Sequence, residues 1–200
     1  MKFIFQTIFF IFLFVQNSFA DEARNWLKKE IDVILNTYKN TNVSAEKSFL
    51  IIEDTINYNF AGAGIAKFVS GNAWSQATKN TKKNYINIFK KHLALSIASM
   101  MQGYTNQEYK LENVKYDEKN KVSLINMEIY NNTGNLLVTW RVKKSKDRYF
   151  VIDLLVADIS LVVTKRSEFN SILKTIDNDL ISLNEILKKQ NEDSYKKIIN

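Results

Sequence analysis

The 200-residue sequence contains no cysteine, no proline and a single histidine. Without cysteine no disulfide can form, so packing alone must hold the fold together. One histidine and no thiol also argue against a transition-metal site, because such sites draw mainly on these two residue types. No catalytic triad is recognisable either. We therefore expect a protein that is not an enzyme and that has no cofactor.

Long hydrophobic runs are equally scarce, and the one present lies at the start of the chain. Lys2, the apolar run 3–15 and the small residues Ser18 and Ala20 have the layout of a secretory signal peptide. The run is shorter than the roughly 20 residues that span a bilayer. We expect residues 1–20 to be removed before Asp21, leaving a soluble periplasmic domain with no cysteine for lipid attachment.

The charge is positive, with a formal value of +7 at pH 7. A basic protein suits an anionic partner, either a lipid surface or a nucleic acid. The lysine pairs are spread along the whole chain, however, from Lys28-Lys29 to Lys196-Lys197, and no nucleic-acid-binding motif accompanies them. We interpret these lysines as solvated surface and expect no nucleic-acid partner.

Helical periodicity dominates the chain before residue 104 and after residue 160. Apolar residues spaced by three and four predict helices over 22–38, 44–57 and 78–102, then over 161–176 and 180–187. Residues 191–200 are polar enough to be a frayed tail. His92 lies on or beside the apolar stripe of the third helix. We interpret it as a hydrogen-bonded packing residue and not as a catalytic base.

A period of two marks the middle of the chain. Residues 109–116, 122–130, 136–143 and 149–156 predict four antiparallel strands in meander order. The last run is apolar on both faces apart from Asp153, so it needs cover on both sides. Strict alternation places Val151 and Leu154 of this run on opposite faces. The predicted fold class is α+β, with a four-stranded antiparallel meander packed by helices.

Two sequence blocks resemble a known family. The first is FAGAGIAKFVSGNAW at 60–74, followed by Thr78; the second is TWRV at 139–142, YFVID at 149–153, VADISL at 156–161 and TKRSEF at 164–169. Together they resemble the MlaC toluene-tolerance family of periplasmic phospholipid carriers. The chain departs from the family pattern at Ala61, Ser70 and Ala157-Asp158, where the family has an acidic residue, a leucine and Glu-Gly.

The resemblance implies a fold and a function. The fold is a sheet of the nuclear-transport-factor type joined to an N-terminal helical subdomain, with a lipid cavity between them. It implies one carrier domain over 21–190, divided into a mainly helical part (21–104), a sheet (105–160) and C-terminal helices (161–190). Such a carrier shuttles phospholipid to maintain outer-membrane asymmetry. Its implied partners are an inner-membrane ABC transporter complex, contacted through its MCE-domain subunit, and an outer-membrane complex of a lipoprotein and a porin.

A carrier must bury acyl chains, since each methylene moved out of water is worth about 0.8 kcal/mol. The large apolar residues of the sheet, the corner after it and the helices are the candidates for contact with lipid tails: Phe68, Val69, Phe89, Ile97, Tyr104, Val138, Trp140, Val142, Tyr149, Val151, Ile159 and Leu161. Each of them can equally be ordinary core. Lys165 and Arg166 are candidates for the headgroup rim, although we favour a structural pairing of Arg166 with Glu168 or Asp153.

Two other hypotheses come from different classes of protein. The first is an enzyme on a cone-shaped sheet, an isomerase or hydratase that uses Asp153 as a base against Tyr149. No second polar group in the sequence is spaced to complete such a site. The second is a periplasmic adaptor that holds no ligand.

Overall fold

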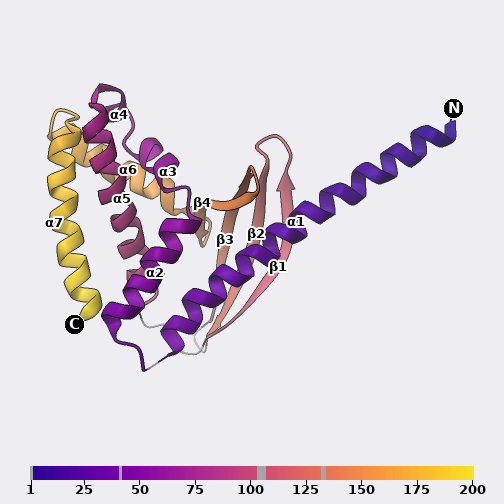
Figure 1. Cartoon of the computed structure of the whole chain (residues 1–200), viewed down its shortest axis with the longest axis horizontal. Helices are drawn as coiled ribbons and strands as arrows, with labels where there is room; N and C mark the ends of the chain where they lie inside the picture. The colour runs from indigo at the N-terminus through magenta and orange to yellow at the C-terminus, as the bar shows by residue number, and fades with distance from the viewer. Residues whose placement is uncertain (1, 41, 103–106, 132–133) are drawn as a thin grey trace.

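Helices form both ends of the chain and an antiparallel sheet forms its middle (Figure 1). The computed structural model describes residues 2–40, 42–102, 107–131 and 134–200, with side chains described from Asp21 onward except at Asn113 and Asn131. The helices before the sheet are α1 (Lys2–Lys39), α2 (Ala45–Asn59), α3 (Gly62–Val69), α4 (Ala73–Gln76) and α5 (Lys79–Met100). The strands are β1 (Glu108–Asp117), β2 (Val122–Asn131), β3 (Gly134–Ser145), β4 (Arg148–Val156) and β5 (Ile159–Ser160), and the last helices are α6 (Leu161–Thr175) and α7 (Leu180–Ile199).

The sheet is a meander in the order β1-β2-β3-β4-β5, antiparallel throughout. The four predicted strands are present, but the prediction of a four-stranded sheet was one strand short. Ala157 and Asp158 both have positive φ, 47° and 64°, and form a two-residue turn that returns the chain directly onto β4. Ile159 therefore pairs with Val156, and the segment expected to be only a corner is a short edge strand.

A β-bulge in β4 changes which residues share a face. Val151 pairs with Val142, whereas Asp153 pairs with Arg141, so Ile152 is left without a partner on β3. Past the bulge the alternation is reversed. The expectation that Val151 and Leu154 lie on opposite faces was therefore wrong, and both are buried on the side that faces the helices.

Asp153 fixes the corner that follows this bulge. Its carboxylate accepts hydrogen bonds from the backbone N–H groups of Leu154 at 2.8 Å and Val162 at 3.2 Å, and from the Ser160 hydroxyl at 2.7 Å. Arg141 Nη1 lies 3.5 Å away on β3. Asp153 is only 3% exposed. One buried carboxylate thus joins β3, β4, β5 and the first turn of α6.

The helices cover the sheet in two ways. α1 runs across the strands and packs against β1 and β2, while α6 packs against β4 (Figure 1). α5, α2 and α7 pack on one another beside the sheet. Side chains cap most of the helix starts, through Ser44 before α2, Thr78 before α5, Ser160 before α6 and Asp179 before α7. The helix predicted over 22–38 is the C-terminal part of α1.

Residues 191–199 belong to α7, so the expected frayed tail is helical to Ile199. Tertiary contacts hold it in place. Asn191 is buried, accepts a hydrogen bond from His92 and donates one to the Ile88 carbonyl at 3.0 Å. The ring of Tyr195 packs edge-on against Phe49 at a centroid distance of 5.3 Å. Polar composition suggested a tail because these partners are remote in sequence, with His92 and Ile88 about 100 residues from Asn191 and Phe49 farther still from Tyr195.

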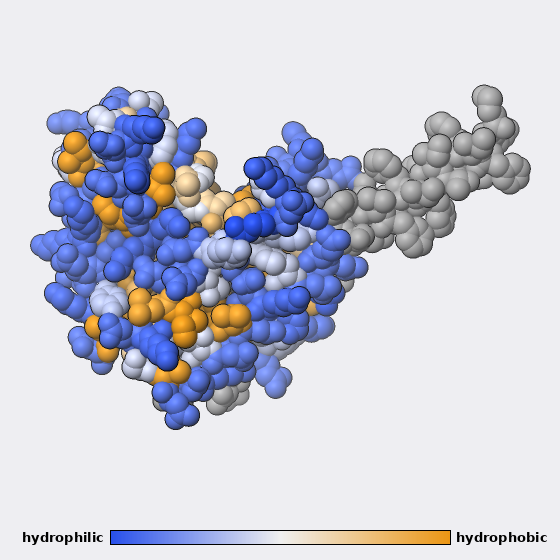
Figure 2. Space-filling view, in the orientation of Figure 1, coloured by the Kyte–Doolittle hydropathy of each residue, from blue (hydrophilic) through white to orange (hydrophobic). Residues whose placement is uncertain are grey.

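The face of the protein in Figure 2 is mainly hydrophilic, with hydrophobic residues gathered in small separate patches over the helices. Across the ranges that the structure describes, no helix combines the length and the apolar character needed to cross a membrane.

Candidate functional site

A cavity of about 420 Å³ lies between the sheet, α1 and the C-terminal end of α5. This volume falls within the range of roughly 300–1,000 Å³ that small-molecule sites occupy. It opens beside Trp140. A solidly packed interior at this place would have contradicted the lipid-carrier hypothesis.

The sheet contributes the inward-facing residues of three neighbouring strands. Val138 and Trp140 come from β3, and register pairs them with Val156 and Leu154 of β4. On the other side Val138 pairs with Met127, and Leu136 with Ile129, both of β2. Because these positions are cross-strand neighbours on one face, they form a continuous apolar surface. The period-two pattern of β3 creates that surface directly from sequence.

The helical wall comes from α1 and the end of α5. Ile31, Ile34 and Leu35 belong to the buried stripe of α1, and Ile97 to that of α5. Met100 and Met101 complete this side. With Met127 on the sheet, every methionine in the sequence except Met1 lines the cavity. Methionine side chains are unbranched and flexible, so this wall can adapt to the shape of an occupant.

Few polar groups reach the cavity. Tyr109 lies on its edge, and its hydroxyl donates to Asp32 at 2.5 Å. Burial acts to raise the pKa of Asp32, but hydrogen bonds from Lys28 and Tyr109 outweigh it and hold that pKa below its usual value. The indole N–H of Trp140 is buried without a hydrogen-bond partner among the described residues. An occupant of this cavity must therefore be predominantly apolar.

Three of the predicted tail-facing residues meet at the cavity. Val138, Trp140 and Ile97 line it together, although Ile97 lies about 40 residues before the other two. The alternation in β3 and the helical stripe in α5 were the signals that identified them.

Four other predicted residues lie in filled core. Val69, Phe89, Val142 and Val151 are 0–2% exposed and do not line the cavity. Phe89, for example, packs edge-on against Phe169 of α6 at 6.0 Å. The sequence could not distinguish these positions from those that line the cavity. A buried apolar position gives the same sequence pattern whether its side chain contacts another side chain or borders a cavity.

Tyr149 packs outside the cavity, at the start of β4. Its ring stacks on Trp26 of α1 at 5.7 Å, and its hydroxyl donates to Glu22 at 2.8 Å. Lys144 also reaches Glu22, at 3.1 Å. The hydrogen bonds from Tyr149 and Lys144 lower the pKa of Glu22. Tyr149 thus fastens α1 to the edge of the β3–β4 hairpin.

Phe68 and Ile159 are 45% and 67% exposed and do not line the cavity. The guanidinium of Arg166 lies 4.4 Å from the centre of the Phe68 ring, and it also donates to the Phe68 carbonyl. Arg166 therefore joins α6 to α3. The pairing that we favoured, with Glu168 or Asp153, is not the one formed: Lys165 pairs with Glu168 at 2.9 Å, and Arg141 with Asp153.

Leu161 and Lys165 line a separate pocket between α5, α6 and α7. Tyr104 lies outside the described residues. Several cavity residues were absent from the predicted set: Ile31, Ile34, Leu35, Met100, Met101, Met127, Ile129, Leu154 and Val156. Most of them belong to apolar stripes that the sequence does display. What the sequence lacked was the information that α1 crosses the sheet and that a bulge turns Leu154 inward.

The geometry does not favour the enzyme hypothesis built on Asp153 and Tyr149. Two backbone N–H groups, a hydroxyl and a guanidinium already surround the Asp153 carboxylate. Tyr149 donates to a different carboxylate, that of Glu22. The two side chains are therefore engaged in separate structural contacts and not in a shared site.

Comparison with known proteins agrees with the geometry. The MlaC protein family matches residues 17–189. No curated protein matches the sequence significantly. Among solved structures, a phospholipid-binding protein from Ralstonia solanacearum, determined in complex with a phospholipid, is similar with a TM-score of 0.75 and 20% identity, over 86% of this chain and 98% of that one. At this identity the likeness is one of fold. Because the family match spans most of its length, the chain belongs to the MlaC family.

Proposed function

We propose that this protein is a periplasmic carrier that binds a phospholipid by burying its acyl chains in the cavity between the sheet, α1 and α5. The observation that supports this most directly is the cavity itself, about 420 Å³ with a nearly continuous apolar wall from Val138, Trp140 and their neighbours. Membership of the MlaC family and the fold shared with a phospholipid-binding protein agree with it.

The physical need for such a cavity is large. At about 0.8 kcal/mol per methylene, the transfer of two ordinary acyl chains from an apolar site into water costs on the order of 20 kcal/mol. A free phospholipid therefore hardly ever leaves a membrane by itself. A protein that shelters the chains removes most of this barrier, and the headgroup can remain in contact with water.

Membership of the MlaC family supports a proposal for the route of the lipid. We propose that the protein is exported by the signal peptide at 1–20 and exchanges lipid with two partners. One is an inner-membrane ABC transporter complex, through its MCE-domain subunit, and the other is an outer-membrane complex of a lipoprotein and a porin. Exchange between them would maintain the lipid asymmetry of the outer membrane.

Native mass spectrometry of the protein purified from its own periplasm tests the central step. A carrier should retain close to one phospholipid per chain, and the delipidated protein should take up lipid again from vesicles. Protein that carries nothing and takes up nothing from vesicles contradicts the proposal and favours a ligand-free adaptor. Edman sequencing of the same sample shows whether the chain begins at Asp21.

A further inference from the structure

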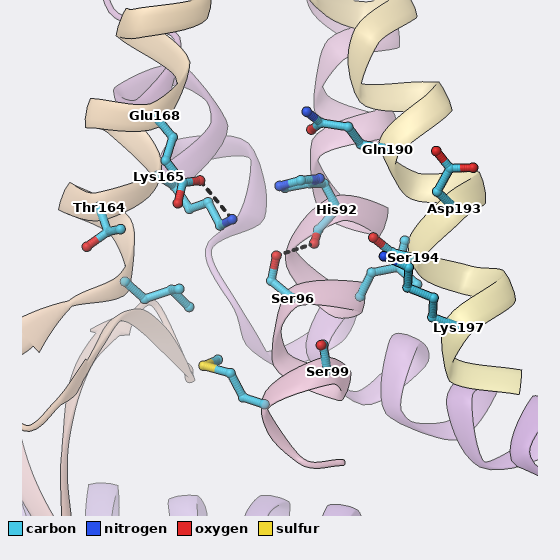
Figure 3. A pocket seen from close by; sticks show the side chains of 13 residues that line it. His92, Ser96, Ser99, Thr164, Lys165, Glu168, Gln190, Asp193, Ser194 and Lys197 are labelled. Atoms are coloured by element: carbon cyan, nitrogen blue, oxygen red, sulfur yellow. Dashed lines mark hydrogen bonds and ion pairs between the residues drawn. The ribbon is translucent and has the colours of Figure 1, made fainter.

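A second, polar pocket lies between α5, α6 and α7, and we call it the α5–α7 pocket (Figure 3). Its volume is about 540 Å³, and it shares His92, Lys165, Glu168 and Gln190 with an adjoining hollow of about 500 Å³. None of these residues lines the apolar cavity. The lining includes two lysines, Lys165 and Lys197, and two carboxylates, Glu168 and Asp193.

His92 has an unpaired hydrogen-bond acceptor in the wall of this pocket. Asn191 donates its amide N–H to the Ile88 carbonyl at 3.0 Å, so its amide oxygen must face His92. That oxygen lies 3.0 Å from Nδ1 of His92. Nδ1 therefore carries the proton in the neutral ring, and Nε2 has the free lone pair. His92 is 9% exposed, and its Nε2 is buried with no partner among the described residues.

The ring lies between α6 and α7, in the gap bordered by Lys165 and Glu168 on one side and Gln190 on the other (Figure 3). Burial, together with the positive charge of Lys165, lowers the pKa of His92 to about 4, so the ring is neutral near pH 7. A buried acceptor without a partner costs free energy. A ligand with a hydrogen-bond donor would remove that cost.

The α5–α7 pocket adjoins the apolar cavity. Met100 lines both, and the part of the pocket formed by Leu95, Met100 and Leu161 is apolar. The charged residues lie beyond it, on α6 and α7. An amphiphile with its chains in the cavity would therefore pass from an apolar to a polar wall at Met100.

We propose that the α5–α7 pocket binds the headgroup of the carried lipid, and that this headgroup is a zwitterion with a primary ammonium group, of the ethanolamine type. The ammonium donates a hydrogen bond to Nε2 of His92 and is balanced by Glu168 and Asp193. The phosphate lies near Lys165 and Lys197. This inference rests on the proposed carrier function and adds a lipid class to it.

Competitive uptake tests the inference. Delipidated full-length mature protein is mixed with vesicles that contain equal amounts of phosphatidylethanolamine, phosphatidylcholine and phosphatidylglycerol with the same acyl chains, and bound lipid is counted by native mass spectrometry. Choline has the same charge but no N–H donor, and glycerol has hydroxyl donors but no positive charge. The wild type should prefer phosphatidylethanolamine over each by about tenfold, the equivalent of one charge-assisted hydrogen bond.

Variants of the pocket separate the contribution of the hydrogen bond to His92 from that of the positive charge of the headgroup. His92→Phe keeps a ring against Phe169 and removes both nitrogens, and it should bring the ratio of phosphatidylethanolamine to phosphatidylcholine close to one. Glu168→Gln combined with Asp193→Asn changes only partly exposed side chains, and it should remove the preference over phosphatidylglycerol. Glu185→Gln is the control, since this exposed glutamate of α7 pairs with Lys188 outside the pocket. It should bind lipid as the wild type does.

Each outcome decides the question. A wild type that loads all three lipids equally refutes the headgroup site but leaves the carrier function intact. A preference that survives in the carboxylate variant also refutes it, even if His92→Phe does not fold. A wild type that takes up no lipid of any kind refutes the carrier function, and the headgroup site with it.

Discussion

Acid should destabilise the fold through His92 before it acts on the paired carboxylates. Burial lowers the pKa of this ring to about 4, from 6.5 in an exposed position. Between these two values the unfolded chain binds a proton that the folded chain does not, so the free energy of unfolding falls as the pH falls. From pH 7 to pH 5 the loss from this one group is about 2 kcal/mol.

Urea unfolding at about pH 7, 6 and 5 measures this loss, with His92→Phe as the comparison. The variant should lack most of the slope. Glu53, whose pKa burial raises, works in the opposite sense, but both proteins contain it and its effect cancels. His92 is the only histidine, so the proton NMR titration of its ring needs no assignment and reports the pKa directly.

The reasoning fails if the resonance titrates near 6.5, because the ring would then be solvated. It fails equally if His92→Phe keeps the full slope between pH 7 and pH 5. Lys165 and Glu168 on α6 and Asp193 and Lys197 on α7 are the charged groups that border the same pocket. Raising the salt concentration should therefore shift the measured pKa only slightly, since burial is its main cause.

Other substitutions address the cavity, the β4–β5 turn and the corner. Val138→Trp should fill the cavity and abolish lipid uptake with the fold retained, whereas Leu137→Trp, on the exposed face of the same strand, should not; equal uptake by both contradicts the cavity wall. Ala157→Gly should raise the free energy of unfolding by about 1 kcal/mol, because φ is positive there, and a less stable variant in urea contradicts this. Asp153→Ala should lower that free energy by about 3 kcal/mol, because buried donors from Ser160 and the backbone lose their acceptor, and a loss below about 1 kcal/mol by thermal melting contradicts it.

The sequence predicted the order of the longer helices and strands, because long apolar stripes and strict alternation are local signals, but not the short helices α3 and α4. It missed β5 because the turn before it needs a left-handed conformation at Ala157 and Asp158, which are not glycine. It missed the bulge at Ile152 because strand register is not visible in the sequence of one strand. Ala157 and Asp158 stand where the family has Glu-Gly, and they still adopt the left-handed conformation. The end of α7 was missed for a related reason, since its partners His92 and Phe49 are remote in sequence.

The site was less predictable than the fold. Trp140 and Val138 were found because one strand displays them in alternation, and both line the cavity. Phe89 and Val151 have the same character and lie in solid core. The two pairs of residues differ in whether the packing around them leaves a cavity. The position of the cavity depends on how α1 crosses the sheet. No periodicity within α1 encodes that crossing.

The three methionines of the cavity can serve as probes of a bound ligand, and they are also sites at which oxidation would change the cavity. Met100 and Met101 lie on the helical side and Met127 on the sheet side, so isotope-labelled methyl groups at these positions would sense an occupant from opposite directions. Oxidation of any of the three to the sulfoxide would place a strong dipole on an oily surface. In an oxidising compartment, oxidation of these methionines would then lower the capacity of the protein to bind lipid. The protein would be sensitive to oxidation in this way although the chain has no cysteine.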